Sequence, residues 1–373
     1  MDLARVSLAS RLFFATERVK DGFLALATAL SSQRNIHFGK TESFALKYIH
    51  HGSRALQVLG SLQESSIEDA RTALVLALTL ITYNDLVVSS PTLPISRSAM
   101  LLAAPWMDQP IGRTIEDTDP NIICVMFSEM FECLVFGRTP VAYFAPPAGN
   151  TIVDRYYGIC HELLPFLYRV CHLYKCVRRG SMSNSEIAFK SSTPAAGLKR
   201  WTPEAAMMTR KGLVPDVKEE RHFLLQARSF KLAIQLLLLQ IQLSQLTDML
   251  ASLKALELEA EINKTRQIGT GKPKYLLFPY FVLCIQLYKT DQELPMTVLE
   301  TMYDISNGMA PKSCQSMFAC LNDVHQNQRR CLHLTWFQCV DTTLPRAMGP
   351  ARIASAALCL RRIKHMRPIN YAS

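Results

Sequence analysis

The stretch ALVLALTLI, residues 73–81, is hydrophobic at every position except Thr79. It follows the sequence SSIEDA, in which a serine can cap the first turn of a helix while Glu68 and Asp69 favour the positive end of that helix. We therefore predict a helix over residues 70–88. Because a helix that is apolar on all sides has to be covered on all sides, this one should lie at the centre of a helical bundle.

Helical spacing of apolar residues continues on both sides of this stretch. Residues 44–59 carry them at i, i+3, i+4 and i+7, residues 121–136 form another apolar helix, and residues 217–263 span two long ones. Further helices are expected at residues 12–30, 152–178, 275–287, 295–306, 312–329, 330–342 and 351–363. No convincing alternation with a period of two is found. We therefore predict an all-α fold, a multi-helix bundle or irregular helical array of about ten or more helices with little or no strand.

Composition divides the chain into three parts. Residues 1–40 are expected to hold an N-terminal helix and a linker, residues 41–345 the main helical domain, and residues 346–373 a basic C-terminal helix and tail. Within the main domain, Ser, Thr, Gly and Pro dominate residues 179–216, so we predict a long loop there, with one short helix after Pro203.

The overall composition is that of a chain that folds around a sizeable core. Of its 373 residues, 49% are hydrophobic and 19% are charged, so disorder is not expected. Many of the eleven cysteines stand among apolar neighbours and no secretory segment follows Met1, which favours reduced thiols in an intracellular protein. The most apolar run, KLAIQLLLLQIQLSQLTDML from Lys231, carries four glutamines. We interpret it as a buried helix and expect no contact with a membrane.

The net charge of +10 favours acidic partners. Most of this charge is spread thinly, and we interpret the basic pairs at residues 178–179, 199–200 and 210–211 as solvated surface. The run RRIKHMR near the C-terminus is denser. It suits either a nuclear address or a contact with an acidic partner, and its cations are Arg361, Arg362, Lys364 and Arg367.

Two adjacent histidines lie in the helix predicted at residues 44–59. Neighbours at i and i+1 point in different directions on a helix, whereas a helical metal pair takes positions i and i+4. We therefore interpret His50 and His51 as part of a solvated face. No two cysteines have the C-x-x-C spacing of a zinc site. The sequence thus predicts no metal and no other cofactor.

Catalytic motifs are weak in this sequence. The loop QIGTGKPKY lacks the first glycine and the final serine or threonine of a phosphate-binding P-loop. In an isoprenoid or terpene-type helical enzyme, acidic residues chelate magnesium around a diphosphate; the candidates here are Glu116, Asp117, Asp119, Asn322 and Asp323. The first three fit a helix cap before residue 121 better. We therefore favour a protein that is not an enzyme, with an isoprenoid-type enzyme and a helical adaptor for protein contacts as alternatives.

Five segments carry more information as an ordered series than singly: ALKYIHHGSRALQVL, TALVLALTLITYNDLVVSS, IICVMFSEMFECLVFG, VDRYYGICHELLPFLYRVCHL and YLLFPYFVLCIQL. The series, from about residue 40 to about residue 345, resembles the C-terminal regulatory domain of fungal-specific zinc-cluster transcription factors. In that family an apolar helix ends in an aromatic and an acidic residue, here Tyr83 and Asp85, and a late helix carries a Pro-Tyr-Phe pattern, here from Pro279.

This resemblance implies a transcription regulator that is located in the nucleus and controls metabolic or biosynthetic genes. Such factors carry an N-terminal module of six cysteines and two zinc ions that reads DNA, whereas the first cysteine of this chain is Cys124. We therefore expect it to act through a protein partner, such as a DNA-binding transcription factor, or as a relative without the zinc cluster. Direct DNA binding is not expected, and a homodimer is compatible with the sequence.

Some domains of this family sense apolar ligands, which draws attention to the soft side chains of residues 121–136. Methionine and phenylalanine adapt to irregular shapes, and a helical bundle can enclose an apolar pocket. The residues concerned are Met126, Phe127, Met130 and Phe131. We interpret these four chiefly as ordinary core, with an apolar ligand pocket as the alternative.

Overall fold

The computed structural model describes residues 16–35, 41–64, 66–87, 91–107, 121–144, 153–154, 157–210, 214, 216–242, 245–267, 275–288, 294–306 and 310–330. Within these residues the regular structure consists of thirteen α-helices and two short 3-10 helices, without strands. One isolated bridge joins Asp154 to Gly158. The prediction of an all-α array of about ten or more helices is confirmed.

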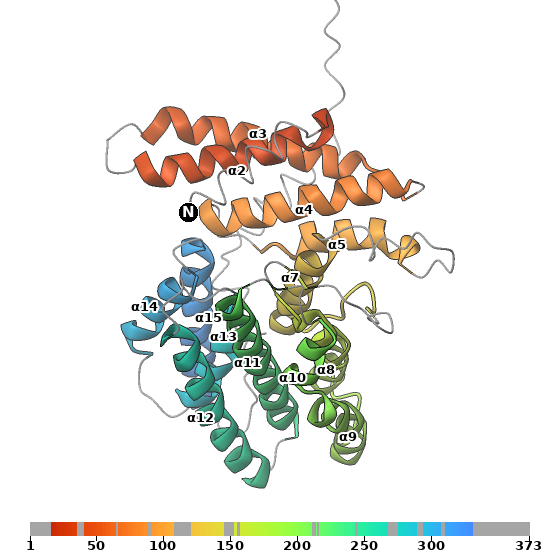
Figure 1. Cartoon of the computed structure of the whole chain (residues 1–373), viewed down its shortest axis with the longest axis vertical. Coiled ribbons are helices and arrows are strands. Elements are labelled where there is room, and N and C mark those ends of the chain that lie inside the picture. Colours follow the sequence, from red (N-terminus) through yellow and green to blue (C-terminus); the bar gives the residue numbers. More distant parts are fainter. Residues whose placement is uncertain are drawn as a thin grey trace, which may run out of the picture.

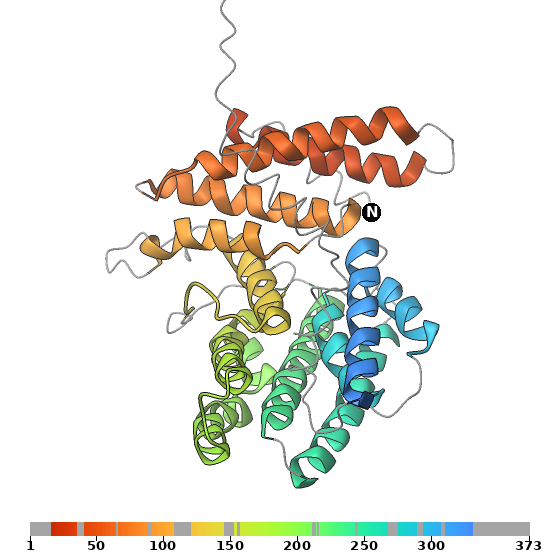
Figure 2. The same ribbon diagram turned by 180° about the vertical axis from the view of Figure 1, so that it is seen from behind.

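The first four helices lie side by side as one layer (Figures 1 and 2). They are α2 (Glu17–Asn35), α3 (Thr41–Ser61), α4 (Ile67–Val87) and α5 (Leu93–Ala103). Glycines bring α2 and α3 close to α4. A Cβ on Gly22 of α2 would lie 2.5 Å from Thr79 Oγ1, and one on Gly52 of α3 would lie 3.1 Å from the Tyr83 ring. A larger residue at Gly22 would therefore force Thr79 or the whole helix to move.

Helix α4 is buried nearly all round, as its sequence predicts. Helices α2, α3 and α5 pack against it within the layer, and α7 and α15 cover the side that faces the rest of the protein. Its buried residues are Ala70, Ala73, Leu74, Leu76, Ala77, Thr79, Leu80, Ile81, Tyr83, Asn84 and Leu86. At its first turn, Asp69 accepts hydrogen bonds from Arg18 (2.8 Å) and from the backbone N–H of Gln63 (3.0 Å). The carboxylate thereby stabilises the positive end of α4 and fixes α2 beside it.

The remaining helices form a second body below this layer in the view of Figure 1. In chain order they are α7 (Asn121–Phe136), α8 (Leu164–Arg178), α9 (Asn184–Arg200), α10 (Pro203–Met208), α11 (Val217–Ile241), α12 (Gln245–Gln267), α13 (Leu277–Leu287), α14 (Met296–Ile305) and α15 (Pro311–Arg330). Helix α11 lies in the middle and contacts α8, α9, α10, α12 and α13. Helix α15 returns to the layer, where the Ser313 hydroxyl donates to Asp85 of α4 at 2.6 Å.

Aromatic rings join α7, α11 and α13 at the centre of the second body. Phe127 of α7 stacks on Tyr157 with ring centroids 4.2 Å apart, and Phe230 of α11 meets Phe127 edge to face at 5.4 Å. Phe230 also contacts Phe278 of α13 at 5.5 Å. Because aromatic pairs contribute beyond the area that they bury, this cluster is a main source of stability for the second body.

The loop predicted at residues 179–216 is wrong for most of its length, because residues 184–200 form helix α9. Ser183 caps this helix: its backbone N–H donates to Glu186 at 2.8 Å, and its hydroxyl accepts from the backbone N–H of Glu186. This capping box offsets the low helix propensity of the serines, of Pro194 and of Gly197 that follow. Gly197 then permits close packing, since a Cβ there would lie 2.8 Å from the Phe166 ring. The short helix predicted after Pro203 is confirmed as α10.

A second difference concerns residues 152–178, for which one helix is predicted. Gly158 adopts a positive φ of 56° in a turn, a short 3-10 helix follows at Cys160–Leu163, and α8 begins only at Leu164. Pro165 therefore occupies the first turn of α8, where the missing N–H of proline costs no hydrogen bond. The helices expected at residues 330–342 and 351–363 lie outside the described residues.

Two helices, α4 and α11, are long and apolar enough to cross a membrane by length and composition alone. In each, 61% of the most apolar window is buried against other helices. Helices at the core of a bundle pass the same test, and the surroundings of both helices fit that explanation.

Replacing Phe230 by Ala should lower the free energy of unfolding by about 3–5 kcal/mol. Phe230 is 1% exposed and contacts rings from α7 and α13, so the substitution leaves a cavity at the centre of the second body. Denaturant unfolding followed by circular dichroism measures the loss. The matched control is Phe189→Ala on α9, where the ring is 78% exposed and the change should stay within about 0.5 kcal/mol. Equal losses in the two variants would contradict the central role of the cluster.

Candidate functional site

The four residues singled out as an apolar pocket lie in the core on α7. Met126, Phe127 and Met130 are buried, and Phe131 is half-buried. Phe127 stacks on Tyr157, whereas Phe131 meets the rings of Phe278 and Phe281 edge to face, at 5.7 and 5.5 Å. Their side chains thus fill the space between α7 and the neighbouring helices. A ligand site at these four residues stays a prediction.

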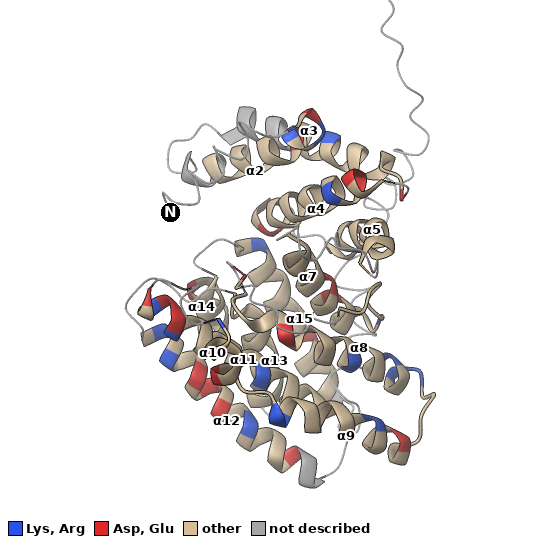
Figure 3. Cartoon of the chain, turned by 45° about the vertical axis from the view of Figure 1, so that its right-hand side comes forward, with Lys and Arg blue, Asp and Glu red and all other residues tan. Residues whose placement is uncertain are grey.

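Positive residues occur on helices of both bodies (Figure 3). The dense group predicted as a nuclear address, Arg361, Arg362, Lys364 and Arg367, lies outside the described residues. Of the pairs interpreted as solvated surface, Lys199 and Arg200 are exposed as expected. Arg210 is instead 1% exposed, which corrects the interpretation of that pair.

Arg210 is buried because an acidic partner lies next to it. Its Nη2 donates to Glu162 Oε1 at 2.6 Å, and Trp201 Nε1 donates to the other oxygen of the same carboxylate at 2.6 Å. The pair joins the end of α10 to the turn before α8. Arg210 and Glu162 are 48 residues apart, so no local pattern in the sequence could have shown the contact.

His51, like Arg210, lies next to an acidic side chain from another helix. Its Nδ1 lies 2.7 Å from Asp21 of α2, and Arg54 Nε lies 3.1 Å from the other carboxylate oxygen of Asp21. The interpretation of His51 as solvated is therefore wrong, whereas His50 is exposed as expected. Among the residues that the structure describes, no three His, Cys, Asp or Glu side chains lie close enough together to hold a metal ion.

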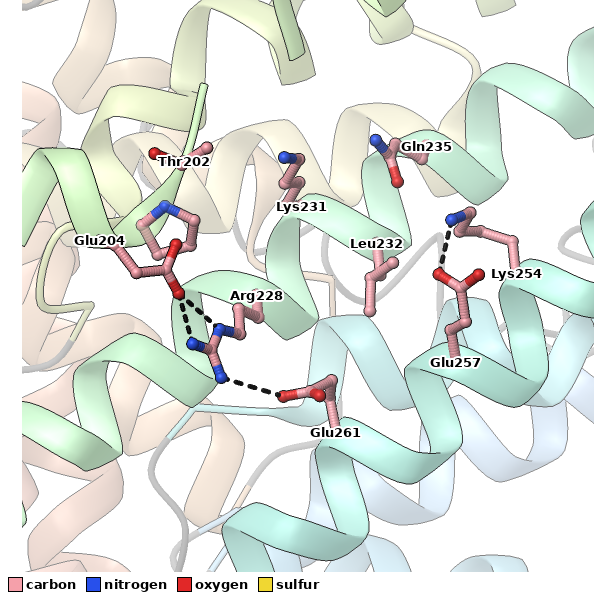
Figure 4. A pocket seen from close by; sticks show the side chains of 10 residues that line it. Thr202, Glu204, Arg228, Lys231, Leu232, Gln235, Lys254, Glu257 and Glu261 are labelled. Carbon is pink, nitrogen blue, oxygen red and sulfur yellow. Dashed lines mark hydrogen bonds and ion pairs between the residues drawn. The ribbon is translucent and has the colours of Figure 1, made fainter. Parts of the chain in front are cut away.

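A cleft of about 350 Å³ opens between α10, α11 and α12 (Figure 4). Three acidic and three basic side chains line it, together with the apolar Pro203 and Leu232. The lining residues are Thr202, Pro203, Glu204, Arg228, Lys231, Leu232, Gln235, Lys254, Glu257 and Glu261. None of the four predicted pocket residues lines this cleft.

All the charges of the cleft except Lys231 form ion pairs with one another. Arg228 Nε donates to Glu204 Oε1 at 2.9 Å, and Arg228 Nη1 lies 4.0 Å from Glu261 Oε2. On α12, Lys254 Nζ lies 2.5 Å from Glu257 Oε2. The arginine therefore connects α10 to α12 across α11, which holds the three walls of the cleft together.

Electrostatic effects in the cleft are moderate. Partial burial and the nearby Lys254 lower the pKa of Lys231, while Glu204 acts in the opposite direction. Burial raises the pKa of Glu204, but hydrogen bonds from Arg228 and from the backbone outweigh it, so the net pKa of Glu204 is lowered. Lys231 Nζ also donates to the carbonyl of Trp201 at 2.7 Å. The residues of the cleft thus form a largely charge-paired wall rather than a nucleophile with a base.

The cysteines in the described part are free thiols, and most of them are buried. Burial raises the pKa of Cys133 to about 12 and the pKa of Cys171 well above its usual value. Because the thiolate is the reactive form, these side chains behave as core residues. The QIGTGKPKY loop and the acidic residues 116–119 lie largely or wholly outside the described residues, and Asn322 and Asp323 lie on α15.

Three carboxyl groups, of the buried Glu129 and the half-buried Glu132 and Asp85, stand where the layer meets the second body. Glu132 of α7 accepts hydrogen bonds from the backbone N–H and the hydroxyl of Thr92, at 2.6 and 2.7 Å. Glu129 accepts from the backbone N–H of Val141 at 2.9 Å and lies 3.5 Å from Arg97. Asp85 accepts from Ser313. Each carboxyl group links two segments that are distant in the sequence.

Burial shifts the titration of these acids towards neutral pH. It raises the pKa of Glu129 and of Glu132 to about 7 and the pKa of Asp85 to about 6, against the hydrogen bonds that act in the other direction. The sequence analysis did not predict the burial of Glu129, Glu132 and Asp85, because the residues next to an acid in an apolar helix do not show whether its carboxyl group is buried.

Comparison with known proteins identifies one family. A family model described as "Fungal specific transcription factor domain" matches residues 23–348, from α2 to beyond α15. No curated protein and no solved structure gives a significant match.

Replacing Glu132 by Gln should make the protein more resistant to rising pH. Because the native state binds the Glu132 proton more tightly than the unfolded chain does, this group's contribution to stability falls as the pH rises from about 4.5 to about 7. The stability difference, variant minus wild type, should therefore be about 2–3 kcal/mol larger at pH 8 than at pH 5. Denaturant unfolding at both pH values measures it. The control is Glu64→Gln, at an exposed residue, and a difference independent of pH in both variants would contradict the assignment.

Proposed function

The chain belongs to the family of fungal-specific transcription factor domains and is a transcription regulator, and we propose that it acts without catalysis, through a DNA-binding partner. The single observation that carries this proposal is the extent of the family match, which spans residues 23–348 and so includes nearly all of the described helices. The helical array is thus the family domain itself rather than an attachment to it.

Two features support a role in binding rather than catalysis. In the cleft between α10, α11 and α12, Arg228 pairs with Glu204 and Glu261 across the walls, and Lys254 pairs with Glu257 within α12. The acids at the junction of the two bodies accept hydrogen bonds that connect helices. Both sets therefore serve the architecture, and the surface is left as the place where a partner binds.

The DNA-binding partner is part of the proposal, and the burial of Cys124 is compatible with it. Zinc-cluster factors read DNA with a module of six cysteines, whereas the first cysteine of this sequence is Cys124, which is buried in α7. A partner that reads DNA would bring the helical domain to its genes. By analogy with the family these are metabolic or biosynthetic genes, and the site of action is the nucleus.

Tethering the chain to DNA tests the regulatory role. A fusion of the whole chain to an unrelated DNA-binding module should change transcription of a reporter by about fivefold or more, since a regulator acts once it is recruited. The Phe230→Ala variant should lose the effect because its core is damaged, and Phe189→Ala should keep it. A reporter that does not respond to a well-expressed fusion would count against regulation. Retardation of target DNA by the purified chain alone at physiological salt would count against the partner.

Nuclear entry tests the basic group at residues 361–367. Replacing Arg361, Arg362, Lys364 and Arg367 by Ala should shift a fluorescent fusion of the whole chain from the nucleus to the cytoplasm. The matched control removes the same number of positive charges from exposed positions of the helical array, at Lys199, Arg200, Lys218 and Arg221. Unchanged nuclear entry of the first variant, or an equal loss in the control, would show that residues 361–367 are not a nuclear localisation signal.

A further inference from the structure

Helix α12 carries apolar side chains on two opposite sides. Its inner side is buried against α11 and α13, through Ala251, Ala255, Leu258 and Ile262. Its outer side exposes Met249, Leu253 and Leu256 to solvent at 57%, 53% and 55%. These three stand at i, i+4 and i+7, so they form one row. We name Met249, Leu253 and Leu256, together with the flanking Leu250 (41% exposed), the outer stripe.

The outer stripe requires an explanation because a surface helix normally turns polar residues to water on the side away from the core. Single exposed apolar residues are ordinary, but a contiguous row indicates a binding surface. One edge of the row adjoins the charged cleft, since Lys254, Glu257 and Glu261 of α12 form a wall of that cleft (Figure 4). The outer stripe is thus the apolar rim of a polar cleft.

The charges around the outer stripe restrict what can cover it. Between residues 248 and 261, α12 carries the acids Asp248, Glu257, Glu259 and Glu261 and the cation Lys254 (Figure 3). Glu257 pairs with Lys254, and Glu261 pairs with Lys264 in the last turn of the helix. This segment is acidic although the chain as a whole has a net charge of +10. A second copy of α12 would bring like charges together, whereas a basic amphipathic helix would meet opposite ones.

The chain itself contains such a segment. The sequence ARIASAALCLRRIKHMR, residues 351–367, places Ile353, Ala357 and Leu360 at i, i+4 and i+7, the spacing of the outer stripe. Its last seven residues carry four cations, and no acid occurs after Asp341. Helix α15 ends at Arg330, in the same body as α12 (Figure 2). At about 3.3 Å per extended residue, residues 331–350 can span up to about 66 Å.

We propose that residues 351–367 form a basic amphipathic helix that packs on the outer stripe of α12 of the same chain. Ile353, Ala357 and Leu360 would cover Leu253, Leu256 and Met249, while the cations of residues 361–367 lie against the acids of α12. This binding mode is that of an amphipathic helix on an apolar surface with a charged rim. It also involves the group suggested above as a nuclear address, so docking would compete with recognition of that group.

Hydrogen exchange on the whole chain tests this contact. Backbone amides of residues 353–363 should exchange about tenfold or more slowly than in an unstructured peptide. The double variant Leu253→Glu/Leu256→Glu should abolish that protection, because it introduces charge in the middle of the outer stripe. The matched control is Phe189→Glu/Met208→Glu, which adds the same charge at residues that are also exposed, 78% and 69%. Circular dichroism establishes that both double variants fold.

Reversing the charges on the two segments distinguishes docking within one chain from the absence of docking. Glu257→Lys/Glu259→Lys should reduce the protection of residues 353–363, and adding Arg361→Glu/Arg362→Glu should restore it. Amides that are unprotected in the wild type, or protection that survives the Leu253→Glu/Leu256→Glu change, would overturn the contact. Protection that is lost on dilution, with a doubled mass at high concentration, would assign the occupant to a second copy and overturn docking within one chain. None of these outcomes depends on regulatory activity, so the proposed function can fail separately.

Discussion

The fold depends on enclosing helices that are mostly apolar. Helices α4, α7 and α13 have little polar surface, and α11 is polar only in its first turns and on the side that faces the cleft. Each must therefore be covered on its other sides by several helices. In this protein α4 is enclosed by α2, α3, α5, α7 and α15, and α11 by α8, α9, α10, α12 and α13. Two enclosed helices joined through α7 explain why the chain forms a layer and a second body rather than one four-helix bundle.

Polar groups decide how these enclosed helices are aligned. Apolar packing alone tolerates shifts along a helix, whereas a buried carboxyl group is stable only opposite its own donors. Glu132 with Thr92 aligns α7 with the start of α5, Asp85 with Ser313 aligns α4 with α15, and Glu162 with Arg210 aligns the turn before α8 with the end of α10. Burial disfavours the charged form of Glu132 and Asp85, so alignment is achieved at a cost in stability at neutral pH.

The helices of this protein were predictable from periodicity wherever an apolar stripe repeats over three or more turns, as in α3, α4, α7 and α11. Helix α9 was not, because its sequence is rich in small residues and its stability comes from a capping box and from Gly197 against Phe166. Polar contacts were missed for a different reason: the partners of His51, Arg210 and Glu132 are 30 to 48 residues away in the sequence. Helix α12 has apolar residues on two opposite sides, so its sequence does not show the single apolar side by which an amphipathic helix is identified. The outer stripe could therefore not be recognised from periodicity.

A regulator of this architecture has to respond at its surface. The aromatic side chains of α7 that could line an apolar pocket are in contact with rings of α11, α13 and residue 157, so a ligand there has to displace core contacts that close packing makes costly to lose. The outer stripe of α12 already faces water, and covering it releases hydrating water without disturbing the core. Binding on α12 therefore changes the surface of the molecule while both enclosed helices stay in place. For a domain with two tightly filled bodies, the contact proposed on α12 would therefore leave the packing of the interior unchanged.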